Sequence, residues 1–292
     1  MTHRVSLCIC TMNRPEDLKK CLASVERSLA RPHEVLVSDD SRDEAIQRAN
    51  REVVGGFAGA AYLAGPKRGL SANRNNCLRL ISGDLVVFVD DDVMLHPEFL
   101  KRGPEEYDRL RALHGTGRII VTGYEIQPGF RAVPSNLSFL GFYTGKVPDT
   151  GEPDAICINS TLFPAELFTR ARFDENILYG TEERDMSIHA AHLGYRTLYS
   201  PDLCNYHYPS PVNRGLYNRS MFVSRFYFGF KRYWLYGRSP VKFALFNVYA
   251  LANAIGNRLK AARFSESLLV VGAFFEAWRL FVSKLRENAR NP

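Results

Sequence analysis

Short runs of apolar residues, each long enough for one strand, recur within the first 90 residues of the chain. The run Leu85–Val89 is apolar throughout, as expected of a strand buried on both faces of a parallel sheet. Segments with helical spacing of apolar residues separate these runs. Strands that alternate with helices predict a parallel, doubly wound α/β sheet. The predicted strands are Val5–Cys10, His33–Ser38, the weaker Ala60–Leu63 and Leu85–Val89, and the predicted helices are Pro15–Val25, Glu44–Val53 and Leu70–Ile81.

The remainder of the chain is less regular. Arg118–Gly123 is predicted to be a strand, and Gly129–Asp154, which is rich in Gly, Pro and Ser, a long loop over the site. A helix is predicted at Met186–Leu193, followed by an edge strand at Tyr195–Ser200. Beyond Pro211 the pattern of apolar residues is helical throughout.

Polar clusters follow three of the predicted strands. They are Thr11–Arg14, Asp39–Asp40 and Asp90–Asp92. In open α/β sheets, ligands bind beyond the carboxyl ends of parallel strands, so the sequence predicts a ligand site at this edge. No glycine-rich dinucleotide fingerprint follows the first strand and no P-loop motif occurs. A nicotinamide dehydrogenase and a P-loop NTPase are therefore disfavoured.

The triple aspartate Asp90–Asp92 is the strongest chemical signal. Adjacent carboxylates at a strand end repel one another unless a cation neutralises them. Asp90 and Asp92 share one side of an extended chain, and their oxygens suit Mg²⁺ or Mn²⁺. A solvated acidic turn is the alternative. His207 follows a later strand at the same edge and is a candidate third ligand, although a lone histidine is more often structural.

Two other residues near this edge suit a nucleotide. Asp39 follows a buried strand and is placed to accept a hydrogen bond from a base N–H or a ribose hydroxyl; a turn or helix-cap role is the alternative. Arg74 lies on the helix before the Asp90 strand and suits a phosphate. A structural salt bridge to the acidic cluster is the alternative for Arg74.

Three acids, Glu182, Glu183 and Asp185, open a predicted helix. The helix dipole alone favours one or two acids at this place. Three within four residues exceed what capping requires, so one of them is a candidate general base for an acceptor hydroxyl.

Charge is distributed unevenly along the chain, which carries a formal charge of +7. Residues 211–292 hold 14 Lys and Arg against 3 Asp and Glu, whereas residues 1–210 hold 24 against 28. We therefore divide the chain into a main domain, 1–210, and a basic, aromatic-rich helical extension, 211–292. Such an extension predicts contact with an anionic membrane surface or with the acceptor. The alternative is that its aromatic residues pack on the main domain; the acidic main domain argues against nucleic acid as a partner.

The sequence also favours a cytoplasmic location. It holds no stretch of about 20 apolar residues and no signal peptide. Its six cysteines form no CxxC pair, which is typical of a reducing compartment. With the basic extension, this predicts a cytoplasmic protein that is peripheral on the inner face of the cell membrane.

Taken in order and spacing, these motifs resemble those of the family 2 inverting glycosyltransferases of the GT-A fold. The resemblance covers about residues 4–210. It implies a Rossmann-like nucleotide-diphospho-sugar transferase fold, in which helices flank a mixed sheet, with a C-terminal helical extension. The motifs that carry it are Cys10–Pro15, Val37–Asp43, Gly69–Asn75, Gly83–Asp92 and Thr181–Asp185, followed by Gly194, Pro201 and His207.

The resemblance also implies roles for individual residues on a nucleotide-sugar donor. Asp39 would contact the nucleobase and Arg74 the diphosphate. Asp90 and Asp92 match the family's DxD motif, with Asp92 coordinating the Mg²⁺ or Mn²⁺ ion that bridges the diphosphate. The other donor contacts expected within the matched motifs are Thr11, Asn13, Arg14 and Asp91.

Glu183 falls on the family's usual position for the catalytic base, where Asp is more common. The longer side chain moves the carboxylate by roughly 1.5 Å, which keeps Glu182 and Asp185 open as alternatives. The predicted activity is metal-dependent, inverting transfer of a sugar to a hydroxyl of a saccharide or a lipid-linked acceptor. A nucleotidyltransferase of related fold and a non-catalytic nucleotide-sugar-binding module are the alternative functions.

Overall fold

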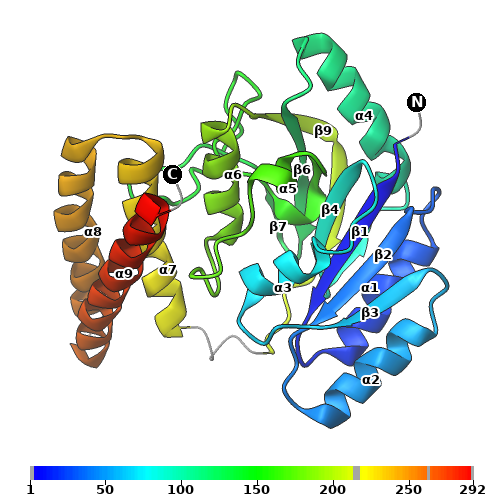
Figure 1. The fold of residues 1–292 in the computed structure, drawn as a ribbon, viewed down its shortest axis with the longest axis horizontal. Helices are drawn as coiled ribbons and strands as arrows, with labels where there is room; N and C mark the ends of the chain where they lie inside the picture. The colour runs from blue at the N-terminus through cyan, green and yellow to red at the C-terminus, as the bar shows by residue number, and fades with distance from the viewer. Residues whose placement is uncertain (1–2, 213–217, 262–263, 291–292) are drawn as a thin grey trace.

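The computed structural model describes residues 3–212, 218–261 and 264–290 of the 292-residue chain (Figure 1). Its centre is a mixed sheet with the strand order β3-β2-β1-β4-β8-β6-β9-β5, to which β7 adds by pairing with β6. The first four strands in this order are parallel, and β8 runs antiparallel to both of its neighbours. The strands are β1 (Val5–Thr11), β2 (Glu34–Asp39), β3 (Ala60–Ala64), β4 (Leu85–Asp90), β5 (Val93–Leu95), β6 (Ile119–Gln127), β7 (Phe130–Ala132), β8 (Thr161–Pro164) and β9 (Arg196–His207).

Helices cover both faces of this sheet, because alternate residues of the central strands are apolar on each side. On β4, Val87 faces the core shared with α1, α2 and α4, whereas Val86 and Phe88 face the core shared with α3, α5 and α6. The predicted strand buried on both faces is thus confirmed. The helices are α1 (Pro15–Glu26), α2 (Glu44–Gly55), α3 (Leu70–Cys77), α4 (Phe99–His114), α5 (Leu167–Arg170) and α6 (Glu182–His192).

The strand predicted at Tyr195–Ser200 is present, and its residues Arg196–Tyr199 pair with β6 alone, but the predicted C-terminal end was wrong. Strand β9 runs on to His207 and lies between β6 and β5 inside the sheet. Pro201 does not stop it, because the pairing with β6 shifts register at this point, and a bulge needs no ladder hydrogen bond from proline.

Other boundaries also differ from the prediction. Helix α3 ends at Cys77 rather than Ile81, and α6 begins at Glu182 rather than Met186. Helix α4, which contains Pro104, was not predicted. The predicted loop 129–154 contains the short strand β7 and two isolated bridges.

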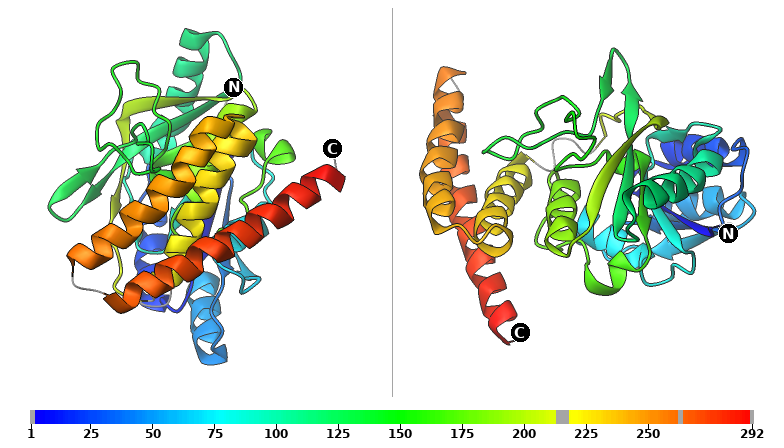
Figure 2. Two further views of the ribbon diagram at one scale, coloured as in Figure 1. Left: turned by 90° about the vertical axis from the view of Figure 1, so that its left-hand side faces the viewer. Right: turned by 90° about the horizontal axis from the view of Figure 1, so that it is seen from above.

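The described part of the C-terminal extension is helical as predicted, apart from residues 211–212, 237–239 and 261. It consists of α7 (Asn218–Phe230), a π-helical turn (Lys231–Tyr236), α8 (Pro240–Lys260) and α9 (Phe264–Arg290). These helices enclose an aromatic core of their own around Phe230, which also contacts Ile177 of the main domain. Figure 2 shows α7 between α8 and α6. In the described part of the chain, no helix combines the length and apolarity needed to cross a membrane.

Candidate active site

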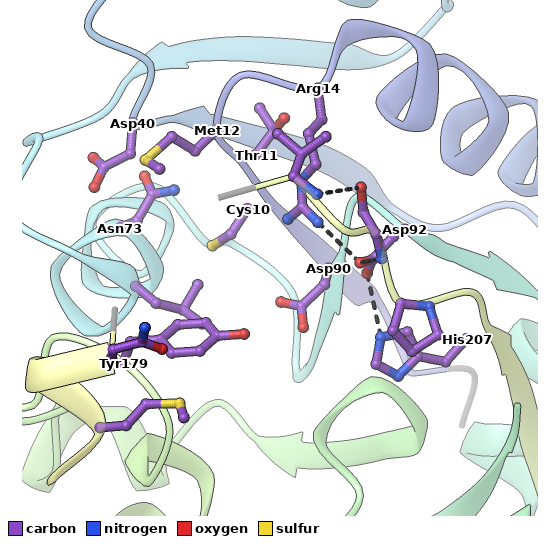
Figure 3. Close-up of a pocket in the computed structure, with 16 residues that line it drawn as sticks. Cys10, Thr11, Met12, Arg14, Asp40, Asn73, Asp90, Asp92, Tyr179 and His207 are labelled. Atoms are coloured by element: carbon purple, nitrogen blue, oxygen red, sulfur yellow. Dashed lines mark hydrogen bonds and ion pairs between the residues drawn. The ribbon is translucent and has the colours of Figure 1, made fainter. Parts of the chain in front are cut away.

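Two cavities meet at the sheet edge where the predicted polar clusters lie. The first cavity, of about 460 Å³, is lined by residues from the ends of β1 and β4 and from the segment after β9. The second, of about 490 Å³, is lined by β6, β7, the 143–145 loop and the start of α6. Asp90, Tyr179 and His207 belong to both linings, so the cavities adjoin. In Figure 3, Asp40 and Asn73 lie at one end of the first cavity and Asp92 and His207 at the other.

Within the triple aspartate, the side chains alternate in exposure as predicted, although Asp91 and Asp92 form a turn between β4 and β5 rather than extended backbone. Asp90 and Asp92 line the first cavity, whereas Asp91 is fully buried. Its carboxylate accepts a hydrogen bond from the Thr11 hydroxyl at 2.6 Å and pairs with the Arg14 guanidinium at 2.6 Å. Asp91 and Thr11 therefore hold the loop, while Asp90 and Asp92 are presented to a ligand.

The same arginine reaches the third aspartate. Arg14 Nη1 lies 2.9 Å from Asp92 Oδ2, which also accepts the backbone N–H of Ser210 at 2.9 Å. Burial alone would raise the pKa of Asp92, but its contacts with His207, the Ser210 N–H and Arg14 hold it below its usual range. Asp92 is thus a carboxylate throughout the neutral pH range.

His207 lies between two carboxylates. Its Nδ1 is 2.8 Å from Glu125 Oε2, and its Nε2 is 3.4 Å from Asp92 Oδ1. Burial would lower the pKa of His207, but the two carboxylates raise it to about 10. Glu125 fixes the ring so that Nε2 points towards the aspartates, an arrangement also typical of metal-ligating histidines.

The donor set at this end of the cavity fits a divalent cation. Asp92 Oδ1 is buried and accepts no hydrogen bond, although the His207 ring lies near it. Mg²⁺ and Mn²⁺ need few protein ligands, because waters and substrate phosphates complete their coordination. Among the described residues no three His, Cys, Asp or Glu side chains are already gathered around one metal position.

Arg74 is buried and makes two ion pairs. Its guanidinium lies 3.2 Å from Asp90 Oδ1 and 3.5 Å from Glu182 Oε1. It lines the second cavity rather than the first. The structural salt bridge considered for Arg74 is therefore present, and its position next to Asp90 keeps it near any diphosphate bound there.

Asp39 and Asn13 lie behind the cavity wall. The Asp39 carboxylate is buried and accepts hydrogen bonds from the Tyr62 hydroxyl and the Ser41 N–H, each at 2.9 Å. Asn13 has a positive φ of 62° and donates its backbone N–H to the Ser41 hydroxyl. Asp40, which sequence analysis did not single out, lines the first cavity instead of Asp39.

Glu183 is partly exposed in the wall of the second cavity. Its Oε1 lies 2.8 Å from the Tyr143 hydroxyl, which is also 3.0 Å from the carbonyl oxygen of Ile156. Burial raises the pKa of Glu183 to about 7 and the charge of Glu182 adds to this, although Arg184 and the Tyr143 hydrogen bond oppose the rise. The group is poised to accept a proton near neutral pH.

The other two candidate bases are occupied by structural contacts. Glu182 caps its own helix, because Oε2 accepts the backbone N–H of Gly180 at 2.5 Å and of Thr181 at 2.9 Å. Asp185 lines neither cavity; its carboxylate is 2.8 Å from Lys231 Nζ in the extension. The structure thus does not bring Asp185 to the site, because the turn of the helix points it at the extension.

Sequence reasoning missed several residues of the site. Glu125 lies two residues beyond the predicted strand end at Gly123, and it is a buried acid, which is unusual. Tyr143 carried no signal, because it lies in an irregular segment with no motif around it, whereas Tyr179 stands two residues before the Thr181–Asp185 motif and could have been considered with it.

The model for the family described as "Glycosyl transferase family 2" matches residues 6–163 of the chain. A search of curated proteins gave no match to the sequence. Among solved structures, the chain is similar to Staphylococcus aureus TarS, at 18% identity and a TM-score of 0.51, with 82% of this chain and 44% of that one covered. It is also similar to GalNAc-T7 bound to UDP, GalNAc and Mn²⁺, at 16% identity and a TM-score of 0.58, with 79% and 51% covered. The chain thus spans about half the length of these two proteins.

Coverage is more even for a mannosyltransferase, PcManGT from Pyrobaculum calidifontis, in complex with GDP-Man and Mn²⁺. The identity is 15% and the TM-score 0.57, with 97% of this chain and 88% of that one covered. For residues 1–349 of TarS in complex with UDP-GlcNAc, the identity is 16% and the TM-score 0.61, with 94% of this chain and 81% of that one covered. At these identities the structural matches establish a shared fold.

Proposed function

Because the chain belongs to glycosyl transferase family 2 and has the fold of these glycosyltransferases, we propose that it moves a sugar from a nucleoside-diphosphate donor to an acceptor hydroxyl with inversion at the anomeric carbon. The acceptor is a saccharide or a lipid-linked molecule. The observation that carries the proposal is Glu183, a partly exposed carboxylate of raised pKa in the wall of a cavity that adjoins the one holding Asp90 and Asp92.

The first cavity is proposed to bind the donor. Its end at Asp40 and Asn73, whose side chains are held by backbone N–H groups and by Ser38, would face the nucleoside, and its Asp92 and His207 end suits the diphosphate and its metal ion. Asp90, Asp92 and His207 are the residues proposed to hold Mg²⁺ or Mn²⁺, with Glu125 orienting the His207 ring. Bound there, the ion would neutralise the negative charge that develops on the leaving diphosphate.

Arginines supply the permanent positive charge of the site. The Arg14 guanidinium lies 2.9 Å from the Asp92 carboxylate, and the Arg74 guanidinium lies 3.2 Å from the Asp90 carboxylate. A diphosphate brought to the same carboxylates with its cation would share these guanidinium groups. The arginines therefore stabilise the leaving group before and after the glycosidic bond breaks.

The second cavity is proposed to bind the acceptor. The acceptor oxygen attacks the anomeric carbon from the face opposite the diphosphate, and its proton passes to the Glu183 carboxylate. The bond between the anomeric carbon and the diphosphate oxygen breaks, and the diphosphate leaves with the electron pair. Tyr143 positions Glu183 for this transfer through the 2.8 Å hydrogen bond.

Replacing the base tests the proposal. A thermal-shift screen of nucleoside diphosphates with Mn²⁺ would first identify the donor nucleotide. Glu183→Gln should then lower kcat by about 10²–10⁴-fold, the range supplied by general bases, without weakening donor binding. Glu105→Gln, on the exposed side of α4, is the matched control and should keep wild-type activity. Full turnover by Glu183→Gln would refute the assignment.

The location proposed for the enzyme is the cytoplasm, at the inner face of the cell membrane. All six cysteines are free and five of them are buried, which fits a reducing compartment.

A further inference from the structure

The outer face of α8 carries an exposed apolar stripe. Val241, Leu245 and Val248 are 70%, 58% and 74% exposed, and their spacing of four and three residues places them on one side of the helix. The opposite side holds Phe246 and Ala250, which are buried in the aromatic core of the extension. A surface helix normally turns polar residues to water, so α8 is unusual in being apolar on both sides.

The charged side chains on α8 and directly before it are all positive. Helix α8 contains no Asp or Glu, and Lys242 and Lys260 are exposed near its two ends. Arg238, also exposed, precedes its first turn. If the stripes of two copies of the chain packed together, these cations would lie close to the same cations of the other copy and repel them, whereas anionic headgroups would attract them. Apolar side chains flanked by Lys and Arg are typical of helices that lie in a membrane interface.

The stripe lies where a flat surface can reach it. Figures 1 and 2 place α8 at one extreme of the molecule, away from the parallel half of the sheet. Trp234, which is 42% exposed, lies beside its N-terminal end, with its ring 5.1 Å from that of Phe243. Tryptophan is enriched at the level of lipid headgroups, so its position agrees with the stripe.

One loop joins the flank of α8 to the second cavity. The Phe139 ring lies 6.2 Å from Tyr249 of α8 and 5.1 Å from Tyr233. Arg232 holds the same loop by donating to the Ser138 carbonyl oxygen at 2.7 Å. Tyr143, the partner of Glu183, is only four residues beyond Phe139, a distance of at most about 14 Å along the chain. The Tyr143 side of the second cavity therefore lies near the flank of α8, where the tail of a lipid-linked molecule would lie in a bilayer.

We propose that the α8 stripe docks on an anionic lipid surface and that the second cavity takes the sugar or phosphate head of a lipid-linked acceptor. The statement about the acceptor rests on the proposed glycosyl transfer. The docking does not, because it requires neither donor nor catalysis.

Flotation with vesicles tests the docking. The wild-type chain should float with vesicles of equimolar phosphatidylcholine and phosphatidylglycerol but not with phosphatidylcholine alone, and added salt should reduce the bound fraction. The variant Val241→Glu/Leu245→Glu/Val248→Glu should lose at least tenfold in bound fraction. The single variant Val248→Glu, at the most exposed of the three positions, should lose binding in part and guards against misfolding of the triple variant.

A matched control separates the stripe from added negative charge in general. Leu29, Leu80 and Leu113 are 64%, 53% and 69% exposed on the main domain. Glutamate at all three should leave flotation unchanged. Equal flotation of the stripe and control variants would overturn the proposal. The proposal would also be overturned if neither the wild-type chain nor the stripe variant floated and the wild-type chain were a dimer that the stripe substitutions convert to a monomer. The stripe would then be a self-association surface.

The docking proposal and the glycosyl-transfer proposal can be refuted independently of one another. Glu183→Gln should float like the wild-type chain, so loss of activity without loss of flotation leaves docking intact. For the acceptor, label from a radioactive donor should enter vesicles of total lipid extract with the wild-type chain, and about tenfold less with the stripe variant. Label found only in water-soluble saccharide would refute the lipid-linked acceptor while sparing the glycosyltransferase assignment.

Discussion

Tyr143 provides a sharp test of how the proposed base works. Its hydroxyl has one proton and two neighbouring acceptors, Glu183 Oε1 at 2.8 Å and the Ile156 carbonyl oxygen at 3.0 Å. When Glu183 is ionised, the hydroxyl donates to it. Once Glu183 has taken a proton it donates to the hydroxyl, which then donates to Ile156. Phenylalanine at position 143 removes this exchange and leaves the ring in place.

The size of the effect follows from the difference between the two states. A hydrogen bond to a charged group contributes about 1.5–3 kcal/mol and one between neutral groups about 1 kcal/mol. Without the hydroxyl, the ionised state loses the stronger bond and the protonated state the weaker one, which disfavours ionised Glu183 by about 0.5–2 kcal/mol, or about one pH unit at 1.36 kcal/mol per unit. In the wild-type chain the pKa of Glu183 is about 7. The ionised fraction at pH 7 should accordingly fall from about a half to about a tenth in Tyr143→Phe.

The assay is the pH dependence of kcat/KM, which reports on the free enzyme. Because the base must be ionised, the wild-type rate should rise with pH through about 7 and then level off. Tyr143→Phe should be about fivefold slower at pH 7 and recover most of this loss one to two pH units higher. The assay temperature must lie below the variant's Tm, because the unpaired Ile156 carbonyl costs stability.

A purely structural role for the hydroxyl would lower the rate equally at every pH, and that outcome would refute the reasoning. A wild-type profile that is flat between pH 5 and 9 would refute the pKa assigned to Glu183. Tyr249→Phe, at an exposed position on α8, should leave the profile unchanged and serves as the matched control.

Three further predictions concern the metal, the ion pairs and the packing. Asp92→Ala should abolish the Mn²⁺-dependent part of donor binding, measured by calorimetry with and without a chelator; unchanged binding would contradict a metal ligand at this position. Lys231→Met leaves two buried carboxylates without their cation and should lower the free energy of unfolding by about 3–5 kcal/mol, measured by denaturant titration; a loss below 1 kcal/mol would show that the carboxylates are neutral or hydrated. Gly229→Ala places a methyl group against the Phe246 ring and should destabilise by at least about 1–3 kcal/mol. Gly256→Ala meets no atom within 4 Å and should be neutral or stabilising by up to about 1 kcal/mol; equal Tm values for the two glycine variants would contradict the packing described.

The sequence predicted those parts of the molecule that depend on local pattern. The runs at Val5–Cys10 and Leu85–Val89 are confirmed as strands because every residue of a strand buried on both faces must be apolar, which leaves a plain signature. The alternation in exposure along Asp90–Asp92 was predicted for an extended chain, but a turn at Asp91 and Asp92 produces it.

Features set by distant parts of the chain were not predictable. Pro201 suggested the end of a strand, and only the bulge opposite β6 explains why β9 continues. Asp39 and Asp40 are adjacent acids at one strand end, yet Tyr62 from the neighbouring strand pairs with Asp39, whereas Asp40 accepts the backbone N–H groups of Lys67 and Gly69 and lines the cavity. Tyr143 reaches Glu183 across 40 residues of chain, without any periodic pattern to announce it.

The three acids at the start of α6 show how helix geometry decides what composition leaves open. Successive residues of a helix are turned by about 100°, so Glu182, Glu183 and Asp185 leave the helix in three directions. Glu182 turns back to cap the first turn, and Glu183 faces the cavity. Asp185 pairs with the buried Lys231 ammonium. Burial would lower the pKa of Lys231, but the charges of Asp185 and Asp174 raise it well above its usual value.

Such a buried pair contributes little net stability, because removing both charges from water costs about as much as their attraction returns. It does, however, penalise any rotation of α6 that would part Asp185 from Lys231. A rotation of one residue would replace Glu183 at the cavity by a neighbour, so the ion pair with the extension fixes which acid is presented to the acceptor. On this argument the extension positions the proposed base, and Lys231→Met should reduce kcat even at temperatures where the variant is fully folded.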